Sequence, residues 1–95
     1  MEFEWDVIKE RINVQIHSVA FGEAVECFYD PYGLKLTDKT HSKNEERFYW
    51  VGKSKSGRIL TTRFTLRKDV IRIIGSAEWR KFRKMYHEAA KNDGP

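Results

Sequence analysis

Three arginines occupy positions from which predicted β-strands could bind an anion. Arg47 begins one predicted strand, while Arg63 and Arg72 each lie in the middle of a later one. If the two later strands form a hairpin, Arg63 and Arg72 lie close together across it. Guanidinium groups on a common face repel one another unless an anion lies between them, and their forked geometry matches two oxygens of a phosphate. We therefore expect these arginines to hold a phosphate group.

Pairing within the chain is the alternative for the arginines. Asp38, Glu45, Glu46 and Asp69 lie in the same half of the sequence. A carboxylate beside each guanidinium would neutralise the face. The sequence alone leaves both arrangements open.

Proton transfer is the second chemistry that the sequence could support. An unperturbed imidazole titrates near neutral pH, so His17 or His41 could act as a general base or acid. Such a group, together with cations that stabilise charge on a phosphate, suffices for metal-independent RNA cleavage through the ribose 2′-hydroxyl. His17 is the leading acid/base candidate. The alternative for each histidine is a polar surface residue.

The last predicted helix and two tryptophans offer further contacts to RNA. Lys81 could supply charge and Tyr86 a proton. Tyr86 also lies on an apolar stripe with Trp79 and Phe82, so packing is its alternative role. Trp50 and Trp79 could stack on a base, although packing in the core is the alternative for both.

Several enzyme classes lack support in the sequence. It contains no glycine-rich phosphate loop and no GxSxG, CxxC or HExxH motif. The three histidines are scattered and Cys27 is the single cysteine, so we expect no metal and no cofactor. One cysteine fits a reducing cytoplasm, and neither a signal peptide nor a membrane-spanning stretch is evident.

Charge is distributed unevenly along the 95 residues, although the net charge is only +4. Residues 1–33 hold two basic and seven acidic residues, a net charge of −5, whereas residues 34–75 hold eleven basic and four acidic residues, a net charge of +7. A basic second half favours a polyanionic partner such as nucleic acid. The alternative is a well-solvated basic surface.

Two helices are predicted near the N-terminus, after a short strand over residues 3–5. Asp6 is an expected N-cap, and the four-residue spacing of Ile8, Ile12 and Ile16 predicts that they share one face of a helix. A second helix is expected over about residues 20–28, with Ser18 as its cap. Residues 30–33 have the composition of a turn.

The second half of the sequence changes to the alternating pattern of strands. Runs beginning near residues 34, 47, 59 and 70 predict four strands, with turns at residues 55–57 and 67–69. A last helix is expected to start near Ser76. The sequence therefore predicts an α+β fold, in which an antiparallel sheet of about four to five strands carries two N-terminal helices and one C-terminal helix. We expect one domain over residues 1–95, with about 91–95 as a frayed tail.

A series of short motifs, in order and with matching spacing, links the chain to a known family. From Phe3 to about Tyr86 the chain resembles the BrnT-type toxins of bacterial type II toxin–antitoxin modules. The motifs are Phe3-Glu4-Trp5-Asp6, Asn13, His17-Ser18-Val19-Ala20-Phe21, Glu23-Ala24, Phe28-Tyr29-Asp30-Pro31, His41-Ser42, Glu45-Glu46-Arg47, Val51-Gly52-Lys53-Ser54, Gly57-Arg58, Ile71-Arg72-Ile73-Ile74-Gly75, and Trp79-Arg80-Lys81 with Tyr86.

The resemblance implies a RelE-like fold and a small toxin that cleaves RNA and arrests translation. It also implies a neighbouring BrnA-like antitoxin, which binds the toxin and represses the shared operon through its own DNA-binding part. By match to the family pattern, the expected catalytic residues are His17, Arg47 and Arg72. Arg63, Lys81 and Tyr86 are expected to bind RNA, on the geometry argued above.

Two residues depart from the family pattern beside His17. Ile16 stands where members usually have lysine, and Ser18 stands where they usually have glycine. Serine at a left-handed backbone position would be strained. The alternative function is therefore a non-catalytic module, a degenerate toxin that binds nucleic acid or a protein through the same basic face.

Overall fold

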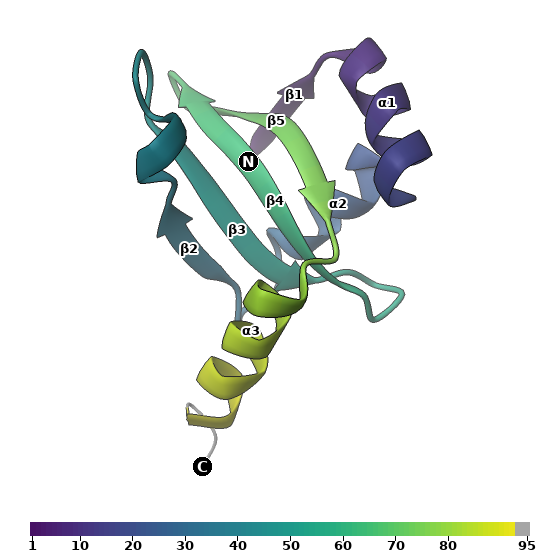
Figure 1. Ribbon diagram of the computed structural model, residues 1–95, viewed down its shortest axis with the longest axis vertical. Coiled ribbons are helices and arrows are strands. Elements are labelled where there is room, and N and C mark those ends of the chain that lie inside the picture. Colours follow the sequence, from purple (N-terminus) through teal and green to yellow (C-terminus); the bar gives the residue numbers. More distant parts are fainter. Residues whose placement is uncertain (93–95) are drawn as a thin grey trace.

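The computed structural model describes residues 1–92 and confirms the predicted order of elements (Figure 1). The elements are β1 (Glu2–Trp5), α1 (Val7–His17), α2 (Phe21–Cys27), β2 (Leu34–Thr37), the short 3₁₀ helix η1 (Lys39–His41), β3 (Arg47–Lys53), β4 (Ile59–Arg67), β5 (Val70–Ala77) and α3 (Arg80–Asn92). Two residues of the predicted tail, Lys91 and Asn92, belong to α3, and the remainder lies outside the described residues. Within residues 1–92, no helix is long and apolar enough to span a membrane.

The five strands form one sheet in the order β1-β5-β4-β3-β2. β2 to β5 are antiparallel neighbours, as predicted, whereas β1 joins the edge of β5 in parallel and makes the sheet mixed. In Figure 1, α2 lies behind the sheet and α3 in front of it. We call the side that carries α3 the open face, because α3 covers only one end of it; it presents Arg47, Tyr49, Arg63, Thr65 and Arg72.

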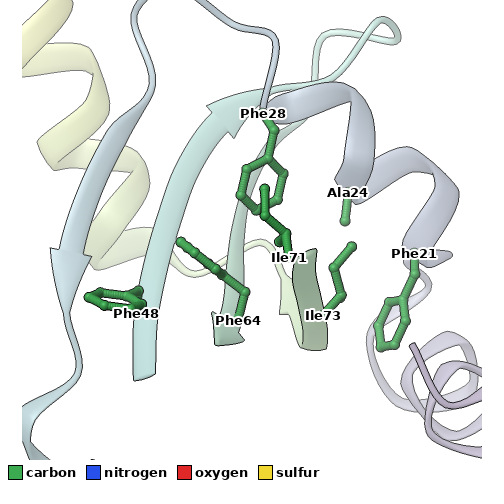
Figure 2. Packing of buried hydrophobic residues seen from close by; sticks show 7 residues of the cluster. All are labelled: Phe21, Ala24, Phe28, Phe48, Phe64, Ile71 and Ile73. Atoms are coloured by element: carbon green, nitrogen blue, oxygen red, sulfur yellow. The ribbon is translucent and has the colours of Figure 1, made fainter. Parts of the chain in front are cut away.

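Aromatic side chains fill the core between α2 and the sheet (Figure 2). Phe28 lies at its centre, with its ring centroid 5.2 Å from that of Phe64 and stacked at 5.4 Å on that of Trp50. The indole of Trp50 donates a hydrogen bond to the carbonyl of Cys27. Trp50 therefore packs within the core, which was the alternative to its stacking on a base. The seven buried residues of this cluster are Phe21, Ala24, Phe28, Phe48, Phe64, Ile71 and Ile73.

The isoleucine face of α1 is exposed to solvent. Ile8, Ile12 and Ile16 are 59%, 50% and 68% exposed, and Asn13 is the one buried residue that α1 contributes. α1 lies against β5 at one side of the sheet, so only its inner side meets the fold. The four-residue spacing identified a common helical face correctly, but spacing does not reveal whether another element covers that face.

Asn13 makes three hydrogen bonds, two of which fasten α1 to β5. Its amide donates to the carbonyl oxygens of Val19 and Ser76, both at 2.8 Å, and its side-chain oxygen accepts from the backbone N–H of Ser76 at 3.1 Å. These contacts are buried, where a polar group without a partner costs free energy. A set of polar contacts thus fixes the helix, while its isoleucine face stays exposed.

Ser18 ends α1 in the left-handed conformation, which is the strained position considered from the family pattern. Its φ is 58°, and its backbone N–H donates to the carbonyl of Val14. The prediction that Ser18 caps α2 is wrong, because Ala20 occupies that position and its side chain makes no capping bond. The carboxylate of Glu10 instead accepts a hydrogen bond from the N–H of Phe21 at the start of α2.

α3 begins at Arg80 and not near Ser76, because β5 continues to Ala77. Tyr86 anchors α3: it is 4% exposed and its hydroxyl donates to the Asp30 carboxylate at 2.6 Å. Burial alone would raise the pKa of Asp30, but this bond and those from the backbone of Tyr32 and Lys53 outweigh it, and the pKa is lowered. Tyr86 therefore joins the helix to the turn that follows α2.

Replacing Asn13 with alanine would leave three buried backbone groups without their partner. We expect Asn13→Ala to lower the free energy of unfolding by roughly 3 kcal/mol, because each unsatisfied buried group costs about 1–3 kcal/mol. Urea unfolding followed by circular dichroism measures this. A loss below about 0.5 kcal/mol would show that these contacts do not hold the helix.

Replacing Ser18 with glycine should stabilise the fold. Glycine adopts positive φ without the Cβ clash, so we expect Ser18→Gly to raise the free energy of unfolding by about 1 kcal/mol. The control is Lys55→Gly in the exposed β3–β4 turn, where φ is not positive and no gain is expected. Thermal unfolding of both variants provides the comparison, and equal or lower stability of Ser18→Gly would argue against strain.

Removing the Tyr86 hydroxyl should destabilise the fold in a pH-dependent way. A hydrogen bond to a charged group contributes about 1.5–3 kcal/mol, and we expect Tyr86→Phe to lose that amount at pH 7. Because the folded-state pKa of Asp30 is depressed, its contribution is present above the unfolded pKa, near 4, and is lost as the pH falls through the folded value. Wild type and variant should therefore converge at acid pH, and a constant difference would contradict this assignment.

Candidate functional site

Three strands present a row of side chains on the open face. Arg47 on β3 lies opposite Thr65 on β4, and Thr65 lies opposite Arg72 on β5. Neighbouring strands are about 4.8 Å apart, so the backbones of the two arginines are separated by roughly 10 Å. Thr65 is buried between them and donates its hydroxyl hydrogen to the carbonyl of Glu46.

The two ends of this row differ in charge. Arg72 pairs with Glu4 of β1 at 2.5 Å. Pairing within the chain is thus correct for Arg72, but its partner is Glu4 and none of the acids expected from the sequence. Within residues 1–92, Arg47 has no carboxylate within 4.0 Å, and its buried Nε has no hydrogen-bond partner. Arg47 is therefore the end of the row that is open to an external anion.

Arg63 lies one step along the open face from this row. It stands opposite Tyr49 on β3, diagonal to Arg47, and opposite Gly75 on β5. In the described part of the chain it makes no ion pair, and its buried Nε has no acceptor. Arg63 is also diagonal to Arg72, because Arg72 pairs with Thr65, two residues further along β4. The two arginines are therefore near one another, as predicted.

A pocket brings Arg63 together with His17. Lys9 and His17 of α1, Arg63 of β4 and Trp79 before α3 contribute to its lining, and none of the described residues around it is acidic. The imidazole of His17 packs edge-on against Trp79, with ring centroids 6.5 Å apart. This site, which we call the basic pocket, offers the cationic side chains of Lys9 and Arg63 and the imidazole of His17 to a single ligand.

A β-bulge in β5 contributes residues to the lining of the basic pocket. Phe64 pairs with Ile73 while the preceding Arg63 pairs with Gly75, so Ile74 is an extra residue in β5. The bulge turns Ser76 toward Asn13 and leaves Ile74 and Gly75 beside Arg63 in the pocket lining. Side chains next to a bulge point in different directions from those of a regular strand. The alternation of apolar and polar residues in the sequence could not locate this bulge.

His41 is held on the other side of the open face by a buried carboxylate. Asp38 is 4% exposed, and its carboxylate accepts from Nδ1 of His41 at 2.9 Å. Burial would raise the pKa of Asp38, but the hydrogen bond and charge of His41 lower it below its usual value. His41, Lys43 and Arg47 line one depression together with Glu45, whose carboxylate pairs with Arg67.

Tyr49 connects the two sides of the open face. Its ring centroid lies 6.2 Å from that of Trp79, and burial followed by the nearby Asp38 carboxylate raises its pKa, opposed by Arg63. Tyr49 therefore stays protonated at neutral pH and can donate a hydrogen bond. Trp79 lines the basic pocket and contacts Tyr49, and Tyr49 in turn lies close to Asp38.

The remaining predicted residues lie apart from the basic pocket. Lys81 is exposed on α3 and borders a depression that Tyr49 also lines. Tyr86 is buried against Asp30, so the packing alternative describes its position. Lys9 was not singled out by the sequence analysis, although its eight-residue separation from His17 places both on one side of a helix.

Cys27 has no place in this chemistry. Its thiol is buried, and burial together with the Glu23 carboxylate raises its pKa to about 12. It is therefore a protonated core residue and a poor nucleophile at neutral pH. Among the described residues, no group of three or more His, Cys, Asp or Glu side chains is arranged to hold a metal ion.

Comparisons with known proteins identify the fold and the family. The model of the family described as "Ribonuclease toxin, BrnT, of type II toxin-antitoxin system" matches residues 5–82. The crystal structure of the Brucella abortus ribonuclease toxin BrnT superposes with a TM-score of 0.64 at 16% sequence identity, covering 83% of this chain and 96% of that one. Comparison with curated protein sequences gives no match. The family match spans most of the sequence, and the chain therefore belongs to the BrnT family of ribonuclease toxins of type II toxin–antitoxin systems.

Proposed function

We propose that this chain is a metal-independent endoribonuclease whose basic pocket holds the scissile phosphate. The observation that carries the proposal is the convergence of Arg63, Lys9 and His17 in one pocket with no acidic residue among its described lining. A site that combines two cations with an imidazole and lacks a competing carboxylate suits a phosphate diester.

The proposed reaction needs only proton transfer and charge stabilisation. The ribose 2′-oxygen attacks phosphorus as its proton passes to a base, and the bond from phosphorus to the 5′-oxygen breaks as that oxygen receives a proton. The products are a 2′,3′-cyclic phosphate and a free 5′-hydroxyl. His17 supplies one of the two proton transfers, while Arg63 and Lys9 stabilise the charge that builds on the phosphate oxygens.

The rest of the open face would bind the neighbouring nucleotides. Arg47, with His41 and Lys43 beside it, is placed to take an adjacent phosphate. Arg72 could bind RNA only if its ion pair with Glu4 were broken. We therefore expect Arg72 to contribute less to RNA affinity than Arg47. Trp79 is half-buried and packs against His17, Tyr49 and Phe82; a base could stack only on the part of its ring that stays exposed. Lys81 would extend the positive surface along α3.

In the cell, we propose that RNA cleavage arrests translation in the cytoplasm until a BrnA-like antitoxin binds the toxin. The type II toxin–antitoxin assignment of the family supports a protein partner of this kind. Contact with operator DNA would occur only through the antitoxin. The basic balance of residues 34–75 favours RNA as the substrate of the toxin itself.

The test is cleavage of a labelled RNA by the purified chain in the presence of EDTA. We expect multiple turnover by wild type and a decrease of about 100-fold or more in kcat/KM for Arg63→Ala, because removing one donor from a preorganised site costs about 10²–10³ in rate. His17→Asn should lose about 10²–10⁴.

Arg11→Ala is the matched control, since Arg11 is exposed on α1 and does not line the basic pocket. It should cleave as wild type does. Circular dichroism verifies that each variant is folded. A salt-dependent complex of wild type with intact RNA would instead support the non-catalytic binding module.

A further inference from the structure

Large apolar side chains on α1 are left exposed by the described part of the chain. Ile8, Ile12 and Ile16 recur every four residues and form a continuous stripe that is at least half exposed. A surface helix normally turns such a stripe toward the core. Here Asn13 fixes the helix by hydrogen bonds, so the stripe is not needed to hold α1 in place.

The isoleucine stripe adjoins the basic pocket. Ile12 and Ile16 line that pocket together with Lys9, His17 and Arg63. An occupant of the stripe would therefore also reach the cations of the proposed active site. Contiguous exposed apolar surface rimmed by polar groups is typical of a protein–protein contact.

We propose that this surface is where the antitoxin docks. The antitoxin segment would lay apolar side chains along Ile8, Ile12 and Ile16 and place a carboxylate against Lys9 and Arg63. The pocket offers two cations and, among its described lining, no acid, so a carboxylate is the complementary group. This inference rests on the proposed function in one respect, namely that filling the pocket inhibits the toxin because RNA binds there.

Two other occupants fit the observations less well. RNA would complement Arg63 and Lys9 but would leave the isoleucine stripe exposed to water. A second copy of this chain, related by a twofold axis through the stripe, would bring the same basic pocket toward itself without supplying a carboxylate to it. An acidic amphipathic segment of another protein matches both the stripe and the pocket.

The experiment measures the affinity of the full chain for the antitoxin encoded beside it. We expect Ile8→Gln to weaken binding about tenfold or more, and Ile8→Gln with Ile12→Gln about 100-fold or more. Leu66→Gln is the matched control, because Leu66 is a comparably exposed apolar residue, 46% exposed, on β4. It should bind within threefold of wild type.

Two further measurements make the result independent of enzyme activity and of folding. Hydrogen exchange of the wild-type chain should show new protection in α1 when the antitoxin is added. Ile8 does not line the basic pocket, so Ile8→Gln should cleave RNA as wild type does while needing more antitoxin for inhibition. If wild type cleaves no RNA but the stripe variants lose antitoxin binding, the docking surface stands and the proposed function fails.

Unchanged antitoxin affinity in the double variant would overturn the proposal. So would unchanged exchange in α1 upon antitoxin binding. Sedimentation of the isolated chain supplies the last discriminating result: a dimer that the double variant converts to a monomer would assign the stripe to a second copy and also overturn the proposal.

Discussion

The candidate active site depends on the buried amide of Asn13. This side chain satisfies the carbonyl of Val19, where the chain enters α2, and both backbone groups of Ser76 in β5. Loss of any one of these bonds would leave a polar group in a buried place, so the arrangement is strongly preferred over a shifted one. Its consequence is that α1 lies against the bulged part of β5 in a fixed register. Lys9 and His17 therefore face Arg63.

A polar anchor also frees the rest of the helix surface. An apolar seam would have held α1 by burying its isoleucines, whereas three hydrogen bonds hold it while leaving them exposed. The same helix can thus contribute Lys9 and His17 to the basic pocket and offer an apolar stripe to a partner. Inhibition by a partner that covers both would follow from this adjacency, without any change in the toxin's shape.

The element order and fold class could be predicted from the sequence because they follow from local signals. Asp6 is an N-cap in the structure as expected, and Gly57, at φ 90°, occupies the predicted hairpin turn. The exposure of the isoleucine stripe could not be predicted. The spacing of apolar residues shows which of them share a helical face, but it does not show whether another element packs against that face. The Arg72–Glu4 pair was missed because it joins residues 68 positions apart through the parallel pairing of β1 with β5. The bulge at Ile74 depends on tertiary contacts, so the alternation of apolar and polar residues in β5 did not predict it.

If the basic pocket is the active site, RNA binds over it with a phosphate between Arg63 and His17. The most direct measurement is a structure of the chain with a short 2′-O-methyl RNA, which lacks the attacking hydroxyl and so remains intact. We expect a phosphate in contact with the guanidinium of Arg63 and the imidazole of His17, with neighbouring nucleotides extending toward Arg47. RNA bound on the α2 side of the sheet, or on the open face with the basic pocket empty, would contradict it.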